Sequence, residues 1–134
     1  MTKILMGLKG MGKTKTLISL VNEAVSKDHG NVVCIEKDAS LRYDISINAR
    51  LVNASEYKID SFDKFYGFVL GLVAGNYDIT DIFVDSVLKF CGDDMAKFEE
   101  CVKAIDAIAP NVNIIMTASY DVANAPEGIK PYLM

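Results

Sequence analysis

Three glycines, a lysine and a threonine near the start of the chain have the types and spacing that bind phosphate groups. Residues 7–14 read Gly-Leu-Lys-Gly-Met-Gly-Lys-Thr, which fits the pattern G-x-x-x-x-G-K-[ST]. Glycines let a backbone curl tightly enough for several N–H groups to point at one anion. The Lys13 ammonium would contact the β- and γ-phosphates of a nucleoside triphosphate, and the Thr14 hydroxyl would ligate Mg²⁺. The segment therefore predicts a P-loop (Walker A motif) that binds ATP with Mg²⁺.

The surroundings of this motif agree with its chemistry. It follows a short apolar strand candidate at residues 3–6, and Lys13–Lys27 has apolar residues at helical spacing. The free N–H groups at the start of such a helix would face a bound anion. The predicted nucleotide-binding residues are Gly7, Gly10, Met11, Gly12, Lys13, Thr14 and Lys15. The alternative is a glycine turn followed by a surface lysine.

Asp85 is the candidate second ligand for Mg²⁺. It follows the apolar run Ile79–Val84, which is typical of a buried strand. Ligands in open α/β sheets bind at the carboxyl ends of the strands, and Asp85 would lie there. Thr14 and Asp85 are therefore the predicted metal ligands. The alternative is an ordinary aspartate at a strand exit, capping the next helix.

The residue that would activate water is less clearly marked. Many hydrolysing P-loop proteins have a glutamate after the metal-binding aspartate, whereas this chain has Ser86. Glu36, at the end of the strand candidate Asn31–Glu36, is the best replacement, because its carboxylate would face the same edge of a parallel sheet. Glu36 and Lys13 are thus the predicted catalytic residues. The alternative for Glu36 is a surface glutamate at a strand end, and Asp38 and Asp44 are lesser candidates.

Four further residues have two interpretations each. Thr117 and Ser119, at the end of the last strand candidate, would either contact the γ-phosphate or cap backbone groups. Arg42 and Arg50 would either stabilise charge at a phosphate, in this subunit or across a subunit interface, or lie in solvent.

Strand and helix candidates alternate along the chain. Clear strands are predicted at residues 3–6, Asn31–Glu36, Ile79–Val84 and 113–118, and weaker ones at 42–47 and 49–52. Helices are predicted at Lys13–Lys27, after an N-cap at Ser61, and between a cap at Asp93 or Asp94 and Pro110. This alternation predicts a single α/β domain, residues 1–134, with three layers: a mainly parallel sheet flanked by helices.

Several segments resemble known proteins. The strand–GLKGMGKT–helix unit and the later segments IFVD and NIIMTAS resemble the P-loop NTPase core, closer to its RecA-like branch than to nucleotide kinases. The segments NVVCIEKD, YDIS and GNYDITDIFVDS resemble a group of short bacterial ATP-binding proteins, some of which are named after the twitching-motility retraction ATPase. This resemblance implies nucleotide binding. It does not imply motor activity, because the single histidine, His29, cannot supply the histidine-containing motifs of those motors.

Composition limits the environment and the partners. The net charge of −4 argues against a general nucleic-acid or membrane-surface binder, which usually has a basic excess. Apolar runs such as residues 68–74 are too short to span a bilayer, and the run at residues 1–6 is too short for a signal peptide, so we expect a cytoplasmic protein. The three cysteines form no C-x-x-C pair and are expected to be reduced and buried. His29 is expected to be solvated in a helix-exit turn.

These observations favour one function over two others. The favoured function is an ATP-binding protein with slow Mg²⁺-dependent hydrolysis that acts as a switch or regulatory module for a protein partner that the sequence does not identify. The first alternative is a small-molecule kinase or transferase, although two arginines and no evident lid count against it. The second is a subunit that uses nucleotide to assemble into a homo-oligomer.

Overall fold

The computed structural model describes residues 1–27 and 30–134, and the prediction for His29 lies outside them. The described elements are β1 (Thr2–Gly7), α1 (Lys13–Lys27), β2 (Asn31–Glu36), β3 (Ala49–Asn53), α2 (Phe62–Gly75), β4 (Ile79–Val84), α3 (Val87–Cys91), α4 (Met95–Ile108), β5 (Asn113–Ser119) and two 3₁₀ turns, η1 (Val122–Asn124) and η2 (Lys130–Tyr132). None of the described helices combines the length and the apolar character needed to cross a membrane.

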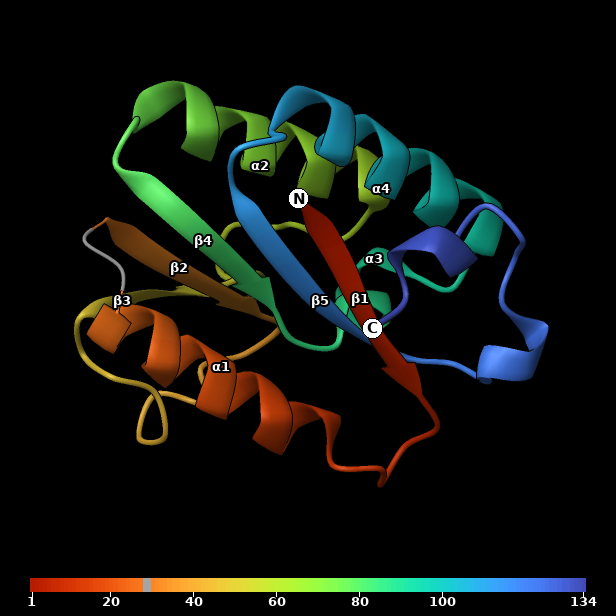
Figure 1. Ribbon diagram of the computed structural model, residues 1–134, viewed down its shortest axis with the longest axis horizontal. Helices are drawn as coiled ribbons and strands as arrows, with labels where there is room; N and C mark the ends of the chain where they lie inside the picture. The colour runs from red at the N-terminus through yellow and green to blue at the C-terminus, as the bar shows by residue number, and fades with distance from the viewer. Residues whose placement is uncertain (28–29) are drawn as a thin grey trace.

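The five strands form one parallel sheet in the order β1-β5-β4-β2-β3. In Figure 1, α2 and α4 run along one face of this sheet and α1 runs along the other. The prediction of an α/β fold with a parallel sheet between helices is therefore confirmed. Because all strands are parallel, their carboxyl ends meet at one edge: Gly7 pairs with Ser119, and Ile35 pairs with Val84 next to Asp85.

An apolar cluster fills the space on each face of the sheet. On one face, Phe65 of α2 and Phe98 of α4 are fully buried against the strands. On the other, Leu17 and Val21 of α1 lie on Phe83 of β4. Leu17 and Val21 are four residues apart, so they lie on one side of the helix. This packing fixes the direction in which α1 leaves the segment after β1.

Two of the three main helices begin at predicted caps. The Ser61 hydroxyl accepts a hydrogen bond from the Lys64 N–H at 3.1 Å, before α2. Asp94, and not Asp93, caps α4 by accepting from the N–H groups of Ala96 and Lys97. Each cap pairs N–H groups that the helix itself leaves without acceptors.

The predicted strand at residues 42–47 is wrong, since these residues form turns. The side chain of Asn22, on α1, donates to the Asp44 carbonyl at 3.0 Å and accepts from the Ser46 N–H at 2.8 Å. Backbone groups that a strand would pair with a neighbouring strand are therefore bound by a helix side chain. The other weak candidate, at 49–52, is confirmed as β3. The short helix α3 was not predicted because five residues are too few to show a helical period.

All three cysteines are buried and free, as predicted. Burial raises the pKa of Cys34 from 9.0 to about 12, and the nearby charges of Glu36 and Asp85 add to this. Burial also raises the pKa of Cys101 to about 12 and that of Cys91 further.

These thiols should make the protein less stable in alkali. Between pH 9 and about 12 the unfolded chain releases thiol protons that the folded chain retains, so the free energy of unfolding falls as pH rises, by about 1.4 kcal/mol per pH unit for each thiol. Urea unfolding at pH 8 and pH 10 would measure this fall. Cys34→Ala should reduce the slope, and equal stabilities at the two pH values would contradict the prediction.

Candidate functional site

The loop between β1 and α1 follows an open path at the carboxyl edge of the sheet. In Figure 1 it leaves the end of β1 and returns to α1 as a wide arc. Gly10 and Gly12 have φ values of 89° and 79°, which L-residues with side chains rarely adopt. Residues 8–12 are exposed. Two of the three glycines predicted to bind phosphate thus lie where the backbone conformation favours glycine.

The Lys13 ammonium lies against this loop. Its Nζ atom donates a hydrogen bond to the Leu8 carbonyl at 2.9 Å, and no other described residue pairs with it. A phosphate oxygen is a charged acceptor and would form a stronger bond than the neutral carbonyl. The contact with Leu8 therefore holds the cation near the loop without engaging it in an ion pair.

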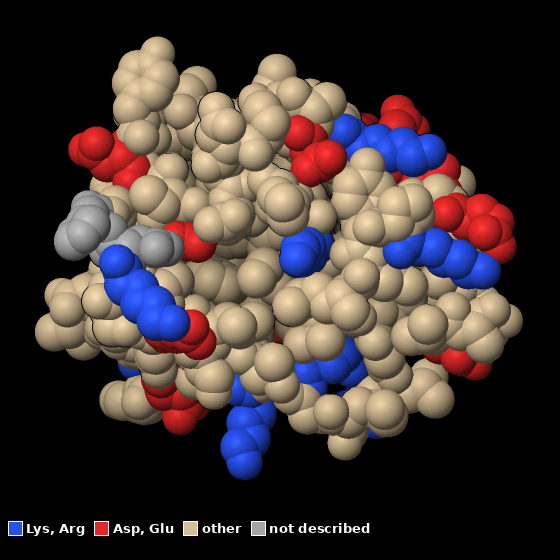
Figure 2. Space-filling model, in the orientation of Figure 1, with Lys and Arg blue, Asp and Glu red and all other residues tan. Residues whose placement is uncertain are grey.

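Positive charge is concentrated around the loop. Before Glu23 the chain has four lysines and no acidic residue, although its net charge is −4. Three of these lysines, Lys9, Lys13 and Lys15, lie in or beside the loop. On the face shown in Figure 2, basic and acidic side chains are both scattered among other residues, and the described residues form no continuous basic patch there. The excess of lysines is therefore local to the part of the chain around the loop.

Asp85 contacts two hydroxyl groups from other elements. The Thr14 hydroxyl, in the first turn of α1, lies 3.1 Å from Oδ1 and 3.3 Å from Oδ2 of Asp85. The Thr117 hydroxyl, on β5, donates to Oδ1 at 3.0 Å. Asp85 is only 9% exposed, and its N–H donates to the Ile35 carbonyl on β2 at 2.8 Å. The structure thus brings together the two residues predicted to bind Mg²⁺.

Ser86, the next residue, has a left-handed backbone. Its φ is 54°, a conformation that costs about 1–3 kcal/mol in a residue other than glycine. Its N–H donates to the Thr117 hydroxyl at 2.7 Å, and its own hydroxyl lies 3.4 Å from Oδ2 of Asp85. No sequence pattern marks this conformation.

The oxygen atoms of Thr14 and Asp85 fit Mg²⁺. This ion prefers hard oxygen ligands and usually keeps several waters, so one carboxylate and one hydroxyl are enough beside two phosphate oxygens. The described residues contain no group of three or more His, Cys, Asp or Glu side chains that could hold a metal without such a ligand.

Glu36 is buried and accepts three hydrogen bonds, unlike the surface glutamate considered as an alternative. It is 3% exposed. One carboxylate oxygen accepts from the N–H and hydroxyl of Ser40 at 2.8 and 2.7 Å, and the other accepts from the Leu41 N–H at 2.9 Å. Glu36 therefore anchors the segment after β2. Its predicted role as a base stays a prediction, because a base also needs an oxygen directed at the substrate.

A cavity of about 290 Å³ lies next to Asp85. Its lining residues are Glu36, Lys37, Asp38, Ser40, Asp85 and Lys89. The cavity joins the ends of β2 and β4, so it lies where Asp85 meets the segment that Glu36 anchors. Lys89 and Ser40 were not predicted as site residues, because neither belongs to a recognisable motif.

The remaining candidates lie apart from Asp85. Arg42 lies over the ring of Tyr43, 4.9 Å from its centre, and Arg50 Nη2 lies 3.5 Å from the Tyr57 hydroxyl. Both arginines are exposed, which agrees with the solvated alternative. Ser119 is exposed and pairs with Gly7 at the start of the loop.

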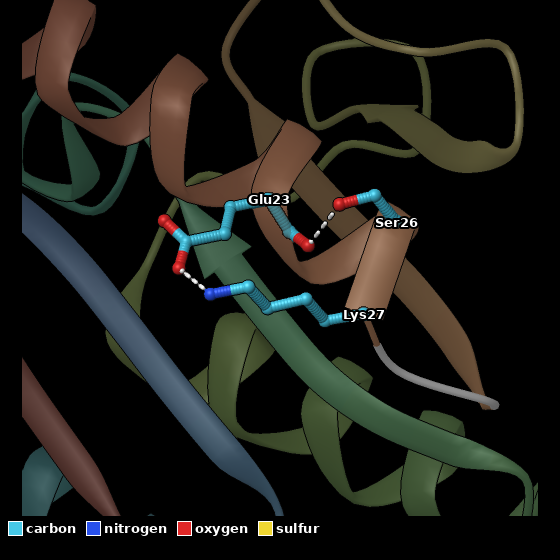
Figure 3. A network of polar contacts seen from close by, with 3 residues as sticks. All are labelled: Glu23, Ser26 and Lys27. Atoms are coloured by element: carbon cyan, nitrogen blue, oxygen red, sulfur yellow. Dashed lines mark hydrogen bonds and ion pairs between the residues drawn. The ribbon is translucent and has the colours of Figure 1, made fainter.

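A second polar group on α1 is separate from this site. Figure 3 shows Lys27 bound to the Glu23 carboxylate at 2.6 Å, while the Ser26 hydroxyl donates to the Glu23 carbonyl at 2.9 Å. Glu23 and Lys27 line another cavity, of about 310 Å³, together with Lys3 and Asp81. None of the predicted site residues lines this cavity.

Comparison with known proteins adds no identification. No family model matches the chain, and no curated protein matches it.

Proposed function

We propose that this protein binds a nucleoside triphosphate, in the first place ATP, together with Mg²⁺, and hydrolyses it slowly as a switch or regulatory module. The contact between Thr14 and Asp85 is the observation that supports this most directly. These residues are 71 positions apart, yet their side chains form a hydrogen bond beside the glycine loop. A motif that matched only by chance would give no reason for a buried aspartate to face its threonine.

Two features near Asp85 support slow rather than fast hydrolysis. Ser86 replaces the glutamate that would orient water, and the Glu36 carboxylate already accepts three hydrogen bonds. The bound triphosphate would therefore have a long lifetime, as a switch requires.

Binding of a fluorescent ATP analogue in Mg²⁺ and in EDTA tests the proposal. We expect the wild-type chain to bind more tightly with Mg²⁺, and Asp85→Ala to lose about tenfold or more of this gain, because the ion loses its only carboxylate ligand. Asp93→Ala is a matched control, since Asp93 is exposed and lies outside the site. A wild-type chain that binds no nucleotide would refute the proposal. An identical Mg²⁺ titration in Asp85→Ala would remove Asp85 from the site.

A further inference from the structure

We infer that Thr117 is a positioning residue that fixes the orientation of the Asp85 carboxylate for Mg²⁺. The inference rests on the proposed function and specifies how its metal site is built. Thr117 was predicted either to contact the γ-phosphate or to cap a backbone group. The structure gives its hydroxyl two partners inside the protein, Asp85 and Ser86.

The direction of each hydrogen bond follows from the chemistry of the groups. The Ser86 N–H can only donate, so the Thr117 oxygen accepts that bond, at 2.7 Å. A hydroxyl has one proton, and the Asp85 carboxylate, 3.0 Å away, can only accept it when ionised. The Thr117 proton is therefore directed at Oδ1 of Asp85 and is not available for a phosphate.

The surroundings keep this arrangement in place. Thr117 is 1% exposed, so water does not compete for its hydroxyl. β5 lies between β1 and β4 in the sheet, which places Thr117 between the phosphate loop and Asp85. The same hydroxyl binds the N–H of Ser86, whose left-handed backbone sets the chain direction just after Asp85. Thr117 thus restrains both the carboxylate and the peptide that follows it.

The two hydroxyl residues at the end of β5 have different partners and different exposure. Thr117 is buried and holds Asp85, whereas Ser119 is exposed and pairs with Gly7. The Ser119 hydroxyl could therefore still contact a phosphate, whereas the Thr117 hydroxyl could not. Without Thr117, Oδ1 of Asp85 would retain only its contact with Thr14, and the carboxylate could rotate away from the metal position.

The test compares metal affinity in three variants of the full chain. In Thr117→Val, which keeps the shape but removes the hydroxyl, Mg²⁺ should bind the complex with an ATP analogue about 10- to 100-fold more weakly. The affinity for the analogue in EDTA should not change, because the loop is untouched. Thr117→Ser should restore the metal affinity. Asn113→Ala is the control on the same strand, because Asn113 is exposed at the other end of β5, and its Mg²⁺ titration should match that of the wild type.

A purely structural role would give a different pattern. If Thr117 only stabilises the fold, Thr117→Val will unfold at a lower temperature but will show the wild-type Mg²⁺ titration, and the inference is overturned. If Thr117→Val does not fold, Thr117→Ala and Thr117→Ser replace it, because they share the lost methyl group and differ only in the hydroxyl. Equal metal affinities in that pair would also overturn the inference. A wild-type chain without nucleotide binding would instead refute the proposed function, and the inference with it.

Discussion

Lys13→Ala is expected to weaken binding of Mg–ATP by about 100-fold, roughly 3 kcal/mol, while the fold stays intact. In the proposed complex the ammonium binds the β- and γ-phosphates, and its removal costs a charge-assisted hydrogen bond. In the structure its only described bond is to the exposed carbonyl of Leu8. Loss of that bond should change the free energy of unfolding by less than about 0.5 kcal/mol.

Titration with a fluorescent ATP analogue and urea unfolding would measure the two effects separately. Lys97→Ala is a suitable control, because Lys97 is an exposed lysine on α4 and lies outside the loop. Lys13→Arg adds a second comparison, since it keeps the charge but changes its shape. ATP affinity that is unchanged in Lys13→Ala would overturn the assignment of residues 7–14 as a phosphate loop.

Glu36→Ala is expected to lower the free energy of unfolding by about 3 kcal/mol, because it removes the acceptor of three buried or part-buried hydrogen bonds. The N–H groups of Ser40 and Leu41 would lose their partners, and the segment after β2 would no longer be fixed to the sheet. Urea unfolding would measure the loss. Amide hydrogen exchange at Ser40 and Leu41 should be faster in Glu36→Ala than in the wild type, while exchange in the core strands should change less.

The same variant separates two roles for Glu36. If Glu36 serves only as a base, Glu36→Ala should lose ATP turnover and keep its stability. If it anchors the segment, as its contacts indicate, Glu36→Ala should lower the free energy of unfolding and the protection of the Ser40 and Leu41 amides from exchange. Glu56→Ala is the matched control, because Glu56 is an exposed glutamate whose side chain has no partner among the described residues. A stable Glu36→Ala variant with normal exchange would contradict the anchoring role.

Local patterns were enough to predict most of the elements. The run Lys13–Lys27 has apolar residues at helical spacing, and its bounds match α1. The runs Asn31–Glu36 and Ile79–Val84 are continuous and apolar, as in strands buried on both faces, and they match β2 and β4. Such patterns are visible in the sequence because the spacing of apolar residues within a segment reflects which of its sides is buried in the core. The glycines, Lys13 and Thr14 could also be grouped by spacing alone, because they are neighbours in the chain.

The sequence by itself therefore determined the glycine-lysine-threonine motif, the parallel α/β class and the position of Asp85 at a strand end. The tertiary structure decided which groups meet there. The strand order places β5 between β1 and β4, so that Thr117 bonds to Asp85 and Ser86. It also buries Glu36 under the residues that follow it. These contacts join segments distant in the chain, and the order of strands in a sheet depends on the packing of the whole domain, which no local spacing of residues encodes.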